Sequence, residues 1–94
     1  GIRIRNIQIS SGREFDAEED RARRRVAILG PTAAANLFGQ TDAIGLQFRI
    51  GRVPFEVIGI TAAKGMDANG VDQDDLILVP LGSAMRRLFH MKRS

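Results

Sequence analysis

The sequence contains no cysteine, tryptophan or tyrosine, and its five aromatic residues are all phenylalanine. Without cysteine the chain forms neither disulfide bonds nor thiolate metal sites, which suits both the cytoplasm and an extracytoplasmic space. No apolar run approaches the roughly 20 residues of a membrane-spanning helix, and the N-terminus lacks the pattern of a signal peptide. Because aromatic residues are few, the core must consist mainly of Ile, Leu, Val and Ala.

The remaining composition is that of a small folded protein. Hydrophobic residues make up 44% of the 94 residues and charged residues 27%, which argues against disorder. A chain of this length forms one domain or part of one. Because the first residue is Gly1 rather than methionine, we expect residues 1–94 to be a single domain or a lobe excised from a larger one.

The net charge of +3 raises the hypothesis of a small basic nucleic-acid-binding module. The densest basic cluster is Arg21, Arg23, Arg24 and Arg25. An acidic cluster precedes it, consisting of Asp16, Glu18, Glu19 and Asp20. On a short helix the two clusters would pair at i,i+3 and i,i+4, and no Tyr or Trp is available to stack on bases. We therefore favour a solvated, self-neutralised helix end and expect no nucleic-acid partner.

The N-terminal third predicts short extended segments and a helical turn. We expect two extended pieces within residues 2–9, bending at Arg5-Asn6, and then a turn over residues 10–13. Asp16 has the position of a helix N-cap, and Glu19 completes a capping box.

Buried β-structure and a second helix follow. Residues 24–29 predict a strand that is apolar on consecutive positions, so both of its faces should be covered. Pro31 begins a helix, and Gly39 stands where a helix ends. The pair Gly51-Arg52 predicts a type II′ turn between two strands of alternating apolar residues, with Phe55 and Val57 sharing a face with Phe48 and Ile50.

The C-terminal third predicts a polar loop over residues 63–73, a last strand over residues 76–79 and a third helix over residues 81–89. The expected fold class is therefore α+β, a small mixed sheet of about five strands with a β-hairpin and three short helices. Its expected core comprises Val26, Ile28, Leu29, Leu37, Phe38, Phe48, Ile50, Phe55, Val57, Ile58, Leu76, Leu78, Leu88 and Phe89.

The chain offers no catalytic or cofactor-binding residues. Its single histidine, His90, lies beside a basic tail and is expected at the surface near the end of the last predicted helix. The serines show no nucleophile motif with a paired base, and the glycines form no phosphate-binding signature. We expect the protein not to be an enzyme.

One acidic loop could supply oxygen ligands to Ca²⁺, which would make the chain a Ca²⁺-binding surface module. Its candidate ligands are Asp67, Asn69, Asp72, Asp74 and Asp75. The segment departs from the EF-hand pattern, because glycine falls at loop position four and no closing glutamate follows. We favour a turn at Asn69-Gly70 whose aspartates accept hydrogen bonds from local backbone groups, with no metal bound.

Several short motifs occur together in a recognisable order. They are Gly12-Arg13-Glu14-Phe15, Val26 to Gly30, Leu37-Phe38-Gly39, Asp42-Ala43-Ile44-Gly45, Phe55-Glu56-Val57-Ile58-Gly59 and Asp74-Asp75 with Val79-Pro80-Leu81. In this order the chain resembles the extracytoplasmic core domain of MacB-type ABC transporter permeases, the superfamily that includes FtsX and LolC. Ala43 departs from the proline usual there. The chain corresponds to the inserted lobe of that domain.

The resemblance implies a non-catalytic, periplasmic domain of a membrane transporter, serving efflux or related transport. Such a domain couples movement of the transmembrane helices to a partner or substrate outside the membrane (mechanotransmission), while ATP is hydrolysed in a separate domain or subunit. The implied partners are the rest of the permease, its ATPase, and a periplasmic adaptor or carrier protein; in the cell-division relatives the partner is a cell-wall hydrolase activator. No cofactor is implied.

An excised lobe would leave strand edges bare. We expect those edges within residues 2–9 and 24–29, because unpaired strands invite pairing, and an apolar patch on the predicted last helix. The isolated piece should therefore be a monomer or a weak dimer.

Overall fold

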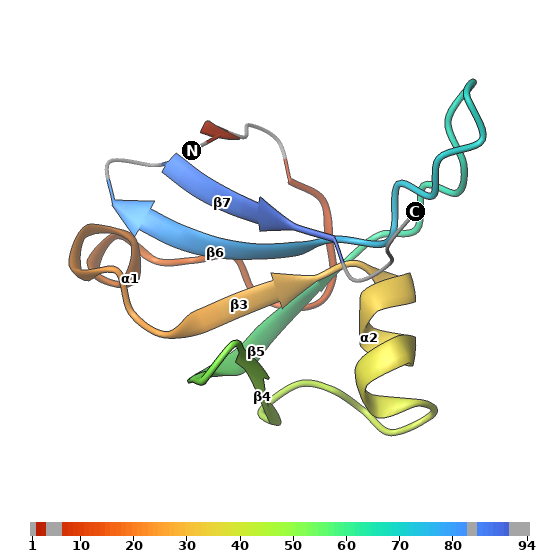
Figure 1. Ribbon diagram of the computed structural model, residues 1–94. Helices are drawn as coiled ribbons and strands as arrows, with labels where there is room; N and C mark the ends of the chain where they lie inside the picture. The colour runs from red at the N-terminus through yellow and green to blue at the C-terminus, as the bar shows by residue number, and fades with distance from the viewer. Residues whose placement is uncertain (1, 4–6, 83–84, 91–94) are drawn as a thin grey trace.

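A computed structural model describes residues 2–3, 7–82 and 85–90. Within them the chain forms seven strands, which make one mixed sheet, and two helices (Figure 1). The strands are β1 (Ile2–Arg3), β2 (Ile9–Gly12), β3 (Val26–Leu29), β4 (Gln47–Ile50), β5 (Val53–Thr61), β6 (Ile77–Gly82) and β7 (Met85–Phe89). The helices are α1 (Ala17–Ala22) and α2 (Pro31–Phe38). The α+β class is confirmed, with more strands and fewer helices than expected.

The sheet has the strand order β1-β7-β6-β3-β5-β2, and β4 pairs with β5 beside β2. β3 runs parallel to β5 and antiparallel to β6, and the remaining neighbours are antiparallel. The expectation that residues 24–29 form a bare edge is therefore wrong: β3 lies in the middle of the sheet. The outer strands are β1, β2 and β4, and each is paired on one side.

Alternate residues of the central strands enter two separate hydrophobic clusters. Ala27 and Leu29 pack in the cluster that α2 and the β4–β5 hairpin cover, whereas Ile28 packs in the cluster that contains Phe15. These three β3 side chains are fully buried. The prediction of a strand covered on both faces is confirmed, and every residue of the expected core is buried or packs against one of the clusters.

The local signals of both helices are confirmed. Asp16 accepts a hydrogen bond from the Glu19 backbone N–H at 2.7 Å, and the Glu19 side chain accepts one from the Asp16 N–H at 3.0 Å, which completes the capping box. Pro31 begins α2, and the N–H of Gly39 donates to the Ala35 carbonyl at its end. Neither helix is long and apolar enough to cross a membrane, which is a finding about the described residues only.

The β4–β5 hairpin also forms as predicted. Phe48 lies opposite Phe55 and Ile50 opposite Val53, and Gly51 has a φ of +62°, as the first turn residue of a type II′ turn requires. Phe48 meets Phe38 edge-on at 6.5 Å and lies 6.2 Å from Phe55 between ring centroids.

The predicted third helix is wrong. The chain instead continues from β6 into the antiparallel strand β7, with Gly82 opposite Met85 and Leu78 opposite Leu88. The apolar spacing also fits a strand that is packed on both faces, because Leu88 contacts the Phe15 cluster and Phe89 the other. A helix would have placed both side chains on one side.

The predicted turn at residues 10–13 is likewise wrong through residue 12, since β2 pairs with β5 there. Its Ser-Ser-Gly composition is typical of turns. As an edge strand, β2 pairs with one neighbour only, and its exposed side chains need not be apolar because they do not enter the core. The bend expected at Arg5-Asn6 lies outside the described residues.

Shortening Phe48 to alanine should lower the free energy of unfolding by about 3–5 kcal/mol, because Phe48 is 7% exposed and packs between two other rings. Urea unfolding of the purified domain measures this. Val53→Ala at the exposed start of β5 is the control and should change stability by less than about 1 kcal/mol. Equal effects of the two substitutions would contradict the assigned core.

Candidate functional site

The segment between β5 and β6, residues 62–76, leaves the sheet and projects away from it at the end opposite α1 (Figure 1). We call it the projecting loop; it includes the polar loop predicted at residues 63–73. It doubles back on itself through a bridge between Met66 and Asp72, and the Gln73 N–H donates to the Gly65 carbonyl at 2.9 Å. The segment is therefore an ordered, hydrogen-bonded projection.

Three of the candidate metal ligands accept hydrogen bonds from backbone N–H groups of the loop. Asp67 Oδ1 accepts from Asn69 at 2.8 Å and from Val71 at 3.0 Å. Asp74 accepts from Lys64 at 2.8 Å and from Gly65 at 3.0 Å, through its two oxygens. Asp72 Oδ1 accepts from the Asp74 N–H. These carboxylates thus have the role that the turn interpretation gives them.

The other two candidate ligands lie apart from this pattern. Asn69 is exposed at the turn, whereas Asp75 is buried at the base. Among the described residues, no group of three or more His, Cys, Asp or Glu side chains is placed to hold a metal ion. Asp67, Asp72 and Asp74 therefore accept hydrogen bonds from the backbone of the loop itself.

The base of the projecting loop is joined to the start of α2. The Thr32 hydroxyl donates to Asp72 Oδ2 at 2.7 Å, and the Thr32 N–H donates to the Asp74 carbonyl at 3.1 Å. At Gly30 a side chain would collide with that same carbonyl, so only glycine lets the two segments approach this closely. The glycine before Pro31 therefore has a packing role besides ending the strand.

Sequence reasoning missed what this loop exposes. Met66 is 70% exposed and Val71 53%, more than any other large hydrophobic side chain in the described residues. A single apolar residue in a polar loop gives little signal in a sequence. Only the projection of the loop shows that both residues are carried away from the core.

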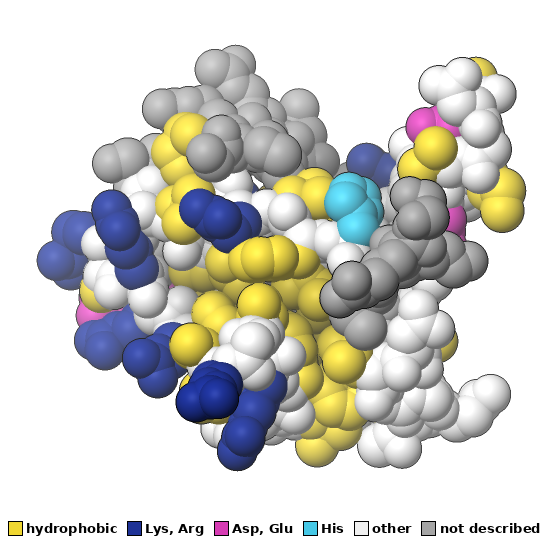
Figure 2. Space-filling view, in the orientation of Figure 1, with side chains coloured by type: hydrophobic (Ala, Val, Ile, Leu, Met, Phe, Trp, Pro, Cys, Tyr) yellow, Lys and Arg dark blue, Asp and Glu magenta, His cyan; other side chains and the backbone are white. Residues whose placement is uncertain are grey.

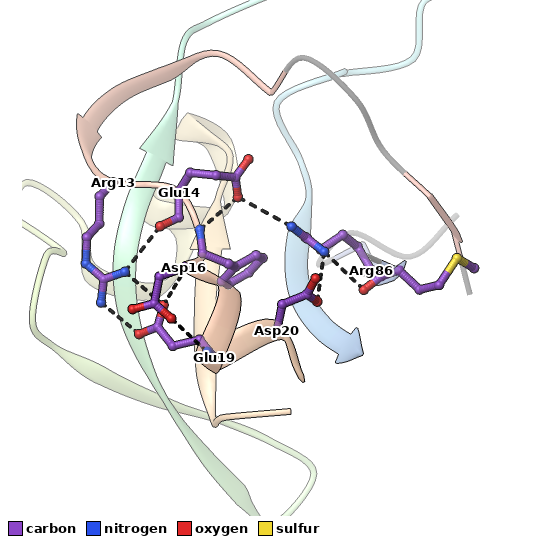
Figure 3. Close-up of polar contacts among 8 residues, drawn as sticks. Arg13, Glu14, Asp16, Glu19, Asp20 and Arg86 are labelled. Atoms are coloured by element: carbon purple, nitrogen blue, oxygen red, sulfur yellow. Dashed lines mark hydrogen bonds and ion pairs between the residues drawn. The ribbon is translucent and has the colours of Figure 1, made fainter. Parts of the chain in front are cut away.

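A second group of polar contacts joins α1 to the segment before it and to β7 (Figure 3). Arg13 binds Glu19 with two parallel hydrogen bonds of 2.8 and 2.7 Å, and Glu19 is largely buried. This bidentate contact with Arg13 is the main reason that the pKa of Glu19 lies below its ordinary value, and the Asp16 N–H adds to it.

Arg86 on β7 makes the other contacts of this group. Its Nη1 is 3.0 Å from Asp20 Oδ1 on α1, its Nη2 is 3.8 Å from Glu14, and its guanidinium carbon is 4.8 Å from the centroid of the Phe15 ring. The residue is only 7% exposed. A buried cation of this kind fixes α1 against β7. The apolar spacing of residues 81–89, which predicts a helix, does not indicate this contact.

The arginine cluster is partly neutralised, as expected, but with a different spacing. α1 ends at Ala22, so Arg24 lies beyond the helix and pairs with Glu18 at 2.7 Å, six residues away. This hydrogen bond lowers the pKa of Glu18. Many of the Lys and Arg side chains visible in Figure 2 lie around α1 and around the β4–β5 hairpin, and others lie elsewhere, one of them beside the base of the projecting loop.

His90 is exposed, as predicted, although it follows a strand and not a helix. Its Nδ1 lies 2.8 Å from the Asp75 carbonyl oxygen, which can only accept, so this nitrogen carries the hydrogen. The contact joins the end of β7 to the base of the projecting loop.

A family model described as the MacB-like periplasmic core domain matches residues 2–94. The chain belongs to this family. It is 47% identical over 79 residues to the macrolide export ATP-binding/permease protein MacB of Chlorobium luteolum and 49% identical over 78 residues to that of Bdellovibrio bacteriovorus. These matches cover 84% and 83% of this chain, and the chain spans 12% of the length of each relative.

Two solved structures share the fold of this periplasmic core domain. The extracellular domain of the noncanonic ABC-type transporter YknZ from Gram-positive bacteria gives a TM-score of 0.66 at 26% identity, over 82% of this chain and 36% of that one. The periplasmic region of MacB from Actinobacillus actinomycetemcomitans gives 0.57 at 17% identity, over 82% and 41%. The protein is a periplasmic domain of a MacB-like ABC transporter permease.

Removing the carboxylate of Asp20 from the periplasmic core domain should lower its free energy of unfolding by about 3 kcal/mol, because Asp20→Ala deprives the buried Arg86 cation of a close counter-ion. The double variant Asp20→Ala/Arg86→Met should recover most of that loss, since no charge is then left buried. Chemical denaturation measures both variants. Glu18→Ala, which breaks an exposed pair, is the control and should have a much smaller effect. A double variant no more stable than Asp20→Ala would contradict this assignment.

The lowered pKa of Glu19 predicts a specific loss of stability in acid. Its charged form is favoured in the folded state, so its contribution is fully present above the ordinary glutamate value of 4.5 and is lost as the pH falls through the lower folded value. Glu19→Gln should therefore reduce stability at neutral pH and flatten its dependence on pH below 4.5. Thermal unfolding from neutral to acid pH measures this. Glu18→Gln is the control, and its effect should be much smaller because solvent screens the exposed pair of Glu18 with Arg24. Parallel pH profiles for Glu19→Gln and the unmodified domain would contradict it.

Proposed function

We propose that this domain is a non-catalytic coupling element, which transmits movement of the transmembrane helices of its parent permease to a partner or substrate outside the membrane. The observation that carries the proposal is the continuity of the fold. One sheet joins β1 at one edge to β2 at the other, and both of its faces are packed. A close-packed body of this kind passes on a displacement without deforming, because its interior has low compressibility.

The relatives supply the wider setting of the proposal. The relatives from Chlorobium luteolum and Bdellovibrio bacteriovorus are named as macrolide export ATP-binding/permease proteins. By analogy, ATP is hydrolysed in a separate domain or subunit of the parent permease, and the parent permease exports a macrolide-like compound. The partners of this domain are then the rest of the permease, its ATPase and a periplasmic adaptor or carrier protein.

The test uses the parent transporter with Phe48→Ala, reconstituted in membrane vesicles. Softening the core should abolish ATP-dependent macrolide export above the temperature at which the domain loosens, whereas basal ATP hydrolysis should continue. Export in the Val53→Ala control should match that of the unmodified transporter at every temperature.

Macrolide export that persists after the domain has unfolded would overturn the coupling role. The nucleic-acid alternative predicts a different result. In a filter-binding assay with single-stranded and duplex nucleic acid, it requires tight binding that falls steeply with salt. Such binding would contradict the coupling role.

A further inference from the structure

We propose that Asn69 is a site of spontaneous deamidation, where the chain itself converts an asparagine into aspartate and isoaspartate as the protein ages. The modified turn covers residues 67–71, in the part of the chain that projects from the sheet (Figure 1). The inference stands independently of the proposed coupling function.

The reaction uses the side-chain amide of Asn69 and the backbone nitrogen of Gly70. That nitrogen loses its proton to hydroxide and attacks the Cγ atom of Asn69. An N–Cγ bond forms, the Cγ–Nδ2 bond breaks, and Nδ2 takes a proton from water and leaves as ammonia. Water then opens the cyclic imide at either of its carbonyl groups, which gives aspartate or isoaspartate. Water is the only co-reactant consumed.

The glycine after Asn69 is the first argument. A side chain on the residue that supplies the nitrogen obstructs its approach to Cγ. Gly70 has no side chain and a φ of +78°, and the space beside its Cα atom is open for 4 Å. Of the three asparagines in the chain, Asn69 alone precedes glycine, because Ile7 and Leu37 follow the other two.

The freedom of the Asn69 side chain is the second argument. Asn69 is exposed, and within residues 2–3, 7–82 and 85–90 its side-chain amide has no hydrogen-bond partner. Its backbone N–H, in contrast, donates to Asp67 Oδ1 at 2.8 Å. The amide therefore turns toward the Gly70 nitrogen without breaking a contact of its own.

Asn36 provides an internal comparison. It is exposed as well, but it lies inside α2, where backbone N–H groups donate along the helix. The residue after it is Leu37, whose side chain packs against a hydrophobic cluster. The nitrogen that would attack Asn36 is thus both held and obstructed, so we expect this asparagine to stay intact.

Hydrogen bonds to Asp67 set the pace at Asn69. The Gly70 N–H donates to the Asp67 carbonyl at 3.0 Å, and Asp67 Oδ1 accepts from the N–H groups of Asn69 and Val71. The bond from Gly70 must open before its nitrogen gives up the proton. The folded turn should therefore react more slowly than the unfolded chain, at a rate that these contacts control.

Conversion changes the turn itself. The imide leaves the Gly70 nitrogen without a hydrogen, so its bond to the Asp67 carbonyl is lost. Isoaspartate then adds a carbon atom to the backbone between Met66 and Asp72, the two residues that form the bridge of the loop. The loop should therefore lose protection of its backbone N–H groups against hydrogen exchange as it ages.

The experiment incubates the full-length transporter at neutral and mildly alkaline pH and follows each asparagine by mass spectrometry of peptides. Asn69 should convert at a rate that rises with hydroxide concentration, while Asn36 stays intact. Asp67→Ala should speed the conversion about fivefold or more, because it removes two hydrogen bonds that hold the turn.

Asp42→Ala is the matched control for Asp67→Ala. Asp42 Oδ1 accepts from the N–H of Ile44, two residues on, as Asp67 Oδ1 does from Asn69. Loss of this contact in another turn should change the rate at Asn69 by less than about twofold. Thermal unfolding of both variants should match that of the unmodified protein, because both aspartates are exposed.

Asn69→Gln tests the consequence for the loop. Its longer side chain keeps the amide but closes a larger and less favourable ring. Hydrogen exchange over residues 65–73 should rise during incubation of the unmodified protein and stay constant in Asn69→Gln. An equal rise in both would contradict the loosening of the loop by deamidation.

The remaining outcomes decide the site and its control. Conversion of Asn36 as fast as that of Asn69 would overturn the proposal. So would an Asn69 that stays intact in the folded transporter and converts only in urea. A rate that Asp67→Ala leaves unchanged would refute the control of the reaction by the turn. Each of these results leaves the coupling function standing.

Discussion

The burial of β3 on both faces is the constraint on which the rest of this domain depends. Ala27 and Leu29 face one hydrophobic cluster and Ile28 faces the other, and all three are fully buried. A strand in this position requires a hydrogen-bonding neighbour on each side, which β5 and β6 provide. It also requires cover on each face, which is why α2 with the hairpin and the Phe15 segment lie where they do.

The same strand connects the core to the projecting loop. Where β3 ends, Gly30 lies against the Asp74 carbonyl, and the next turn of the chain donates hydrogen bonds to the loop base. The order of the loop follows from its aspartates, which accept from backbone N–H groups that would otherwise have no partner in the loop. The Asp67 and Asp74 carboxylates thus hold the loop backbone in its conformation.

Much of the fold was predictable where the decisive interactions are local. The capping box at Asp16, the Pro31–Gly39 helix and the Gly51-Arg52 turn all form as expected, because each depends on residues within a few positions of one another. The two strands that the local patterns did not predict, β2 and β7, have ambiguous sequences. Ser-Ser-Gly is typical of turns, and apolar spacing at residues 81–89 fits a helix as well as a strand packed on both faces.

The sequence by itself determined the class of the protein, its core residues, its turn glycines and, through the order of its motifs, its family. Only the tertiary structure decided that Arg86 would be buried against Asp20, that β3 would be central, and that Met66 and Val71 would be carried into solvent. The physical reason is distance along the chain. Arg86 and Asp20 are 66 residues apart, and Thr32 and Asp72 are 40 apart, so no local pattern records contacts that form only when the sheet brings their strands together.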